Sequence, residues 1–195
     1  MSNKNLHIII QLFMQEIEGV HIENQLLLLI IESLVVFLAW VVLRKRNIPL
    51  YKYILGFLFL AYSGIVMSIT VFRRPVGSRE GIVHLFVYLG FGLRTGDPSL
   101  RVSAYSVLNI LLFVPLGILV YLKSNKDNSL KCIALCTFMG AFISLLIECT
   151  QLITGRGMFE ITDILTNASG SLIGAILMAV VIGIWNKIVV KKLKV

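Results

Sequence analysis

Five long apolar runs divide the chain, and each is long enough to cross a lipid bilayer. A transmembrane helix needs about 20 predominantly apolar residues, because it rises about 1.5 Å per residue through a hydrocarbon core about 30 Å thick. Only 14% of the 195 residues are charged and 57% are hydrophobic, whereas a soluble domain carries about 25% charged residues. The sequence therefore predicts an all-α fold, a polytopic transmembrane helical bundle with about five spans. These spans are 25–43, 53–72, 105–122, 132–153 and 164–185.

Two further apolar segments are too short to span a bilayer. Residues 6–17 mix apolar side chains with glutamine and glutamate, which fits either an interfacial helix at the membrane surface or an unstructured tail. Residues 82–91 lie in a glycine-rich connector and fit an interfacial or re-entrant piece. Without an obvious linker, we predict one compact unit in three parts. They are an extra span with its interfacial helix (1–52), the main membrane domain (53–185) and a basic cytoplasmic tail (186–195).

The distribution of basic residues predicts the orientation. A net charge of +8 in a soluble protein would suggest nucleic acid, but in a multi-pass protein basic residues collect in cytoplasmic loops. The segments 43–52, 123–131 and 186–195 hold eleven of the 18 basic residues and one of the ten acidic residues. We therefore expect a multi-pass protein with its N-terminus outside and its C-terminus in the cytosol, and no nucleic-acid partner.

The connector 73–104 departs from this charge rule. It carries five arginines although the topology places it outside. One interpretation is contact with anionic lipid head groups. The other is that long basic side chains simply reach the interface from the end of a span.

Polar side chains flank the turn between the last two predicted spans. Glu148 and Gln151 share one face of the first helix, and Asp163 and Asn167 share one face of the next, because residues three or four apart are neighbours on a helix. Arg156 lies in the Gly-Arg-Gly turn between them. The predicted topology brings this turn and the start of the third span to the outer leaflet boundary. The candidate ligand-binding residues are Asn109, Glu148, Gln151, Arg156, Asp163 and Asn167.

Several of these residues have simpler structural interpretations. Asp163 near a helix N-terminus can satisfy free backbone N–H groups and the helix dipole. Asn167 can join helices by a hydrogen bond, and Gly170 with Gly174 fits small-residue helix packing. Glu32 lies at membrane depth in the first span, where an ionisable side chain usually faces the protein interior.

Three classes of function are compatible with this polar cluster. The cluster can bind an outer-leaflet ligand, or it can lock spans together in an accessory membrane subunit. It can also catalyse a reaction on a lipid or glycan precursor, with Glu148 and Asp163 as an acid/base pair and Arg156 holding a phosphate or carboxylate. Against an enzyme, no Ser-His or Cys-His pairing is evident. The three histidines lack metal-ligand spacing, so no metal is expected.

Two ordered motifs resemble the VanZ-like family of membrane proteins. Residues 109–117 fit its N-x-x-x-F-x-P-x-G signature through Asn109, Phe113, Pro115 and Gly117. The second signature is matched by Glu148-x-x-Gln151, Arg156, Asp163-x-x-x-Asn167 and Gly170-x-x-x-Gly174. The resemblance covers about residues 53–185. The family's N-L-x-P-F element in the connector is at best a remnant here, at residues 83–86.

The resemblance implies a protein of the bacterial cytoplasmic membrane. The member that gives the family its name lowers susceptibility to the lipoglycopeptide teicoplanin, which carries an acyl tail and acts on cell-wall precursor at the outer leaflet. The partners implied are membrane lipids and either a lipoglycopeptide or a lipid-linked cell-wall precursor. No cofactor is implied.

Overall fold

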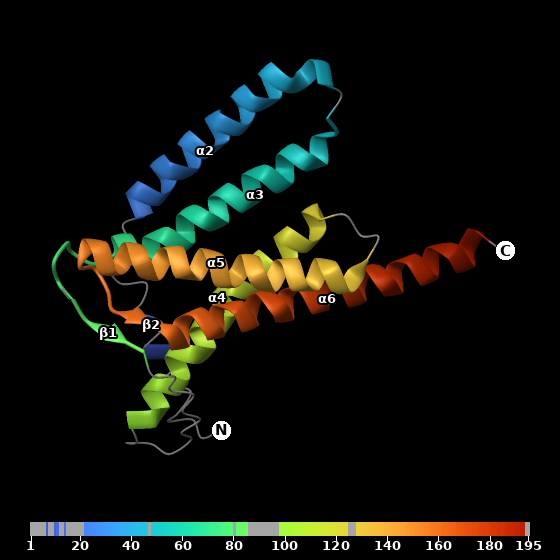
Figure 1. Ribbon diagram of the computed structural model, residues 1–195. Helices are drawn as coiled ribbons and strands as arrows, with labels where there is room; N and C mark the ends of the chain where they lie inside the picture. Colours follow the sequence, from blue (N-terminus) through green and yellow to red (C-terminus); the bar gives the residue numbers. More distant parts are fainter. Residues whose placement is uncertain are drawn as a thin grey trace.

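The computed structural model of the protein is a bundle of long helices with two short strands at one end (Figure 1). It describes residues 22–46, 48–79, 81–85, 98–124 and 128–193, together with positions 7, 10, 11 and 14. The long helices are α2 (Ile22–Leu43), α3 (Leu50–Met67), α4 (Pro98–Lys123), α5 (Ser129–Thr154) and α6 (Ile161–Leu193). A 3-10 turn, η1 (Arg44–Arg46), follows α2, and a π-helical turn, η2 (Ser68–Phe72), follows α3.

In the part of the chain that the structure describes, five helical segments are long and apolar enough to cross a membrane, which confirms the predicted fold class. Their bounds are wider than the predicted spans. Helix α4 begins at Pro98 and α6 runs to Leu193, because helical hydrogen bonding continues past the apolar run. Most of the predicted interfacial helix 6–17 lies outside the described residues. The membrane-spanning segments are Gln25–Arg46, Leu50–Phe72, Ala104–Lys123, Ser129–Thr154 and Ile161–Ile188.

Helices α4 and α6 pack with their backbones close together. A β-carbon at Gly170 or Gly174 of α6 would overlap a backbone carbonyl of α4, that of Ile110 or Val114 respectively. Membrane helices associate through such small-residue faces, because they gain van der Waals contact without a hydrophobic driving force. The predicted packing role of Gly170 and Gly174 is therefore confirmed.

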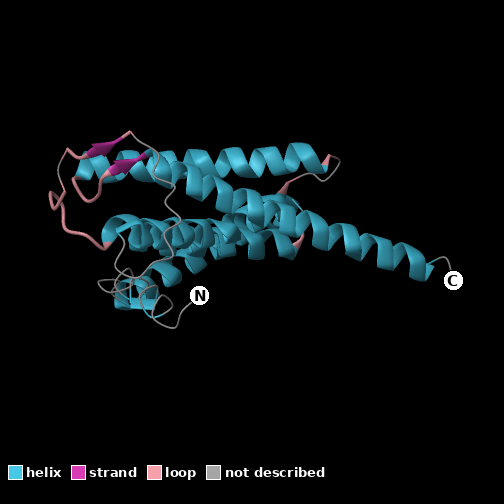
Figure 2. Cartoon of the chain, turned by 90° about the horizontal axis from the view of Figure 1, so that it is seen from below, coloured by secondary structure: helices cyan, strands magenta, loops and turns pink. Residues whose placement is uncertain are grey.

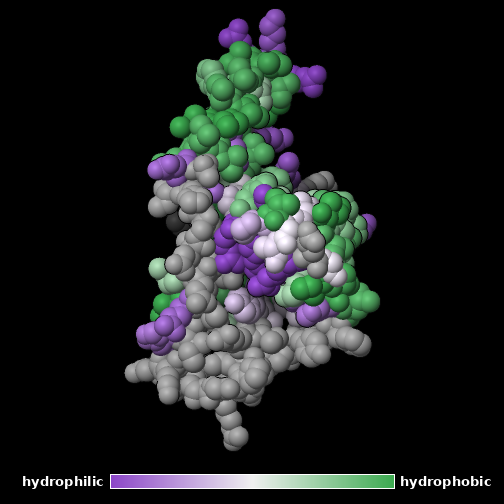
Figure 3. All heavy atoms as spheres, turned by 90° about the vertical axis from the view of Figure 1, so that its left-hand side faces the viewer, coloured by the Kyte–Doolittle hydropathy of each residue, from purple (hydrophilic) through white to green (hydrophobic). Residues whose placement is uncertain are grey.

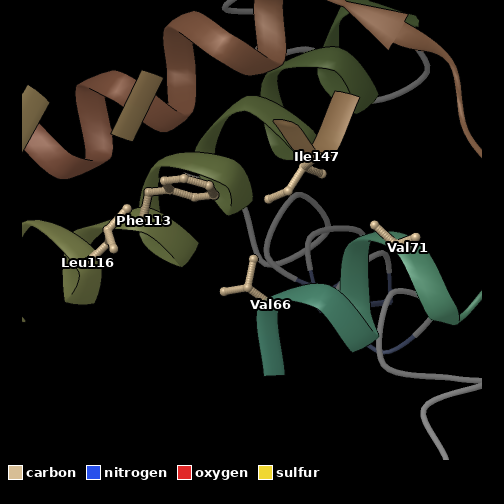
Figure 4. Packing of buried hydrophobic residues seen from close by; sticks show 5 residues of the cluster. All are labelled: Val66, Val71, Phe113, Leu116 and Ile147. Carbon is tan, nitrogen blue, oxygen red and sulfur yellow. The ribbon is translucent and has the colours of Figure 1, made fainter. Parts of the chain in front are cut away.

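A buried apolar cluster joins α3 to the rest of the bundle. Val66 of α3 and Val71 of η2 pack against side chains of α4 and α5 (Figure 4). The cluster lies close to the end of the bundle where the strands are found. It therefore fixes the position of η2, which contributes to the site described below. Its buried members are Val66, Val71, Phe113, Leu116 and Ile147.

Helix α2 lies along α3 and is otherwise largely exposed (Figure 1). Gln25 donates a side-chain hydrogen bond to the hydroxyl of Ser68. Leu28 and Glu32 lie against Gly64, which has no side chain to keep them away. Glu32 is buried in this contact, so the expectation that it faces the protein interior is met at the α2–α3 interface.

Two short strands form a feature that the sequence did not predict. Strand β1 (Val83–His84) pairs in parallel with β2 (Phe159–Glu160), and the N–H of Phe159 donates to the carbonyl of Ile82 at 3.0 Å. The strands lie at one end of the helices (Figure 2). The predicted interfacial or re-entrant segment 82–91 thus begins with a strand, and residues 86–91 lie outside the described part of the chain.

Candidate functional site

The bend after α5 is held against the connector that follows η2. Gly155 ends α5 with a left-handed backbone (φ 60°), a conformation that glycine adopts without steric cost. The N–H of Arg156 then donates to the carbonyl of Gln151 at 3.0 Å. From the connector, the N–H groups of Gly77 and Arg79 donate to the carbonyls of Thr154 and Gly155, at 3.1 and 2.8 Å. These backbone hydrogen bonds therefore hold the bend in one position against the connector.

Glu148 lies in the last two turns of α5, before this bend, and is only 2% exposed. Its Oε2 atom accepts a hydrogen bond from the N–H of Glu160 at 2.8 Å. Since Glu160 belongs to β2, the carboxylate of Glu148 ties the short sheet to α5. A buried carboxylate needs such donors in place of water.

Gln151 joins α5 to the π-helical turn. Its side-chain Nε2 donates to the carbonyl of Thr70 at 2.8 Å. In a π-helical turn, a carbonyl accepts a hydrogen bond from the N–H group five residues later. For Thr70 that position is Pro75, which has no N–H group to donate. The Gln151 side chain also fills the space beside Gly157, where a β-carbon would come within 3.0 Å of it.

Two amide side chains connect helices near the same end. Asn109 of α4 donates from Nδ2 to Oδ1 of Asp163, in the first turn of α6, at 2.8 Å. Further along α6, Nδ2 of Asn167 donates to the hydroxyl of Ser144 in α5 at 2.8 Å, and both residues are buried. These bonds join α6 to both of its neighbours, so Asn167 has the helix-joining role that was one of its two interpretations.

Arg156 differs from the other polar residues of the bend. Its guanidinium carbon lies 5.4 Å from the centre of the Phe72 ring, within range of a cation–π contact. Its Nε atom is buried and has no hydrogen-bond partner among the described residues. Phe72 itself is 62% exposed.

Charged groups gather around Glu148. Glu160, whose backbone N–H donates to Glu148, carries a second acidic side chain at this end. His84 Nδ1 lies 3.8 Å from Oε1 of Glu160, which adds an ion pair when the imidazole is protonated. Figure 3 views this end of the molecule and shows hydrophilic side chains gathered in one area bordered by apolar ones.

The structure brings the six predicted residues to one end of the bundle, but not into a single contact group. Glu148, Gln151 and Arg156 surround the bend, the pair Asn109–Asp163 joins α4 to α6, and Asn167 lies deeper. Whether these residues bind a ligand stays a prediction.

Sequence reasoning missed several partners of these residues. Ser144 lies four positions before Glu148, on the same face of α5, and that spacing was available as a signal. Glu160 makes its contact through its backbone N–H, which its residue type does not indicate. No sequence pattern pointed to Phe72 or to the carbonyl of Thr70.

The chemistry open to this site is that of carboxylates, amides and a guanidinium. Among the described residues, no three His, Cys, Asp or Glu side chains are grouped so as to hold a metal ion. The accessible groups of the site can form hydrogen bonds and ion pairs with a polar ligand. Glu148, by contrast, is placed to hold the protein's own backbone.

Compared with protein-family models, the chain matches the VanZ/LLP1 family over residues 34–183. The matched region begins within α2 and includes α3 to α5 and most of α6. No curated protein and no solved structure is significantly similar to the chain.

Proposed function

The chain belongs to the VanZ/LLP1 family and is a multi-pass membrane protein; from this premise we propose that it binds an amphiphilic ligand at the outer leaflet of the bacterial cytoplasmic membrane. The ligand is a lipid-linked cell-wall precursor or a lipoglycopeptide of the teicoplanin type. Binding lowers the susceptibility of the cell to such drugs. In this proposal the N-terminus faces outward and the C-terminus faces the cytosol.

The observation that carries the proposal is the set of polar side chains at one end of an otherwise apolar bundle. Ionisable side chains within membrane segments, such as Glu148 and Asp163 here, are costly unless they are paired, and they mark functional sites. Arg156 has a buried Nε without a partner among the described residues, and the predicted orientation places the bend at the outer surface. A ligand with a polar head and an apolar tail complements this end.

Within this function, Glu148 positions the site rather than contacting the ligand. It is almost fully buried and bonded to the N–H of Glu160. Asp163, which is less buried, accepts from Asn109. These bonds hold the strands and helix ends that present Arg156 and Glu160 to the surface.

The same bonds favour a second candidate, a non-catalytic accessory membrane subunit. In that case, the hydrogen bonds of Glu148, Asp163 and Asn167 only lock α4, α5 and α6 together. This candidate differs from the first in one respect, since it requires no ligand at the bend.

Drug susceptibility and drug binding to the cell surface test the proposal together. Cells without the protein are compared with cells producing the wild type, Glu148→Ala or Glu148→Gln at matched levels in the membrane. We expect the wild type to reduce susceptibility to a teicoplanin-type drug and the amount bound at the surface, Glu148→Gln to retain much of the effect, and Glu148→Ala to lose it. A glycopeptide without an acyl tail is the matched control drug.

Unchanged drug binding and susceptibility in cells that produce the wild type would reject the proposed function and leave the accessory role. An effect that survives Glu148→Ala in full would show that the polar end is not involved.

A further inference from the structure

Arg156 and Phe72 form a pair whose other contacts leave the guanidinium group available. Arg156 comes from the bend after α5, and Phe72 ends the membrane segment Leu50–Phe72. We propose that this pair is a binding site for the phosphate group of a lipid, with the guanidinium on the phosphate and the ring against the start of the apolar part. This inference rests on the proposed function and names the chemical group that its site recognises.

The backbone around Arg156 holds this residue in place. Its own N–H is bonded to the carbonyl of Gln151, and Gly155 before it is bonded through its carbonyl to the N–H of Arg79. Gly157 after it faces the Gln151 side chain so closely that a β-carbon would not fit without a shift. A side chain that extends from such a fixed backbone loses less entropy when it binds a ligand.

The donors of Arg156 have no competing acceptor in the described part of the chain. The carboxylates at this end have other donors or partners: Glu148 accepts from the N–H of Glu160, Asp163 from Asn109, and Glu160 lies beside His84. The N–H groups of a guanidinium point outward in its own plane. A guanidinium that lies over an aromatic ring therefore still directs two N–H groups toward an oxyanion, which it binds bidentately. The Nε–H of Arg156 is buried without an acceptor among the described residues, which is unfavourable for a donor removed from water, so those residues do not use the guanidinium in a hydrogen bond.

The surroundings favour a lipid phosphate over a soluble anion. Phe72 is 62% exposed at the end of a membrane segment, where a free phosphate would gain nothing from the ring. The backbone of Arg79 is bonded to Gly155, so a second arginine begins beside the bend, and its side chain is exposed. Positive charge beside the bend favours an anionic head group at the membrane surface.

The test measures lipid binding by the purified full-length protein in nanodiscs of phosphatidylcholine. The probes are a fluorescent polyprenyl phosphate, a fluorescent phosphatidate and, as the uncharged control, the matching polyprenol. The variants are Arg156→Gln, Arg156→Lys and Phe72→Leu. Arg46→Gln is the matched control, because it removes the same charge from η1 at the opposite end of α3 (Figure 1).

We expect the wild type to bind at least one phosphate lipid at least tenfold more tightly than the polyprenol. Arg156→Gln loses at least tenfold in affinity for that lipid, Arg156→Lys an intermediate amount because lysine does not bind bidentately, and Phe72→Leu severalfold. Arg46→Gln binds as the wild type. Preference for polyprenyl phosphate identifies a lipid-linked precursor as the source of the phosphate, and equal binding of phosphatidate identifies phospholipid in general.

Equal affinity of the wild type for polyprenyl phosphate, phosphatidate and polyprenol would overturn the inference, and so would wild-type affinity in Arg156→Gln. The comparison of probes on the wild type needs no variant, so a variant that fails to fold leaves the test intact. Phosphate-dependent binding without any effect on drug susceptibility would reject the proposed function alone. Drug protection that survives Arg156→Gln would reject this site alone.

Discussion

At the scale of single residues, the polar end of the molecule is organised by side chains that bond to backbone groups of other elements. Glu148 holds the N–H of Glu160, and Gln151 holds the carbonyl of Thr70. Each side chain satisfies a backbone group that would otherwise need a water molecule: an N–H group of β2 for Glu148, and a carbonyl of η2 for Gln151. These two residues of the motif therefore determine where neighbouring segments end and how they meet.

Replacing Glu148 tests its contribution to stability. Glu148→Ala leaves the N–H of Glu160 without its acceptor and a cavity beside it, so we expect the free energy of unfolding to fall by about 1–3 kcal/mol or more. Glu148→Gln retains an acceptor oxygen and should cost less. Unfolding in detergent, followed by circular dichroism, measures both, with Glu23→Ala as the control because Glu23 is exposed in the first turn of α2. Equal loss in Glu148→Ala and Glu23→Ala would contradict the assigned bond.

The bond between Asn167 and Ser144 is open to a double-mutant cycle. Both side chains are buried and the bond joins α5 to α6. Coupling energies between polar side chains in membrane proteins average about 0.6 kcal/mol, so we expect coupling of about 0.5–1.5 kcal/mol between Asn167→Ala and Ser144→Ala. Unfolding free energies of the two single variants and the double variant give this value. Additive effects would show that the two side chains act independently.

Residue types and spacing identified the polar residues but not their partners. Glu148, Asp163 and Asn167 stood out because ionisable and amide side chains are unusual beside apolar runs. Their partners include backbone atoms of Glu160 and Thr70, and every residue carries such atoms. Nothing in a sequence distinguishes the backbone N–H that will meet a carboxylate.

At the scale of elements, close packing of α4 on α6 dominates the bundle. Gly117 of α4 lies against the backbone of Ser171, and Gly170 and Gly174 of α6 lie against the backbone of α4. The glycine spacing predicted this face, since glycines four apart share one side of a helix. The strands β1 and β2 escaped prediction because two residues are too few to show an alternating pattern.

Alanine substitutions at glycines of α6 separate this packing from helix propensity. Gly174→Ala places a β-carbon on the carbonyl of Val114 and should destabilise the protein by about 1–3 kcal/mol. Gly183→Ala on the same helix meets nothing within 4 Å and should be neutral or slightly stabilising, because alanine favours a helix over glycine. Unfolding midpoints of the two variants, compared with the wild type, provide the measurement. A Gly174→Ala protein as stable as Gly183→Ala would mean that α4 and α6 are not in close contact there.

At the scale of the whole molecule, the proposed function depends on which side of the membrane holds the bend. With five membrane segments, as found in the described residues, we propose that the N-terminus and C-terminus lie on opposite sides, and the basic residues predict that the C-terminus is inside. An orientation can be predicted from sequence alone because it follows from the composition of the connectors, whereas contacts follow from three-dimensional packing. Which ligand the protein binds depends on the arrangement of atoms at its surface, and composition does not describe that arrangement.

Cysteine labelling of intact cells tests this orientation most directly. In a background without Cys132, Cys136 and Cys149, a single cysteine is introduced by Ser78→Cys, beside the bend, or by Ser129→Cys, at the other end of α5. Both positions are exposed. With a membrane-impermeant maleimide, the account predicts labelling of Ser78→Cys in intact cells and of Ser129→Cys only after permeabilisation. Labelling of Ser129→Cys in intact cells, with Ser78→Cys protected until permeabilisation, would contradict it.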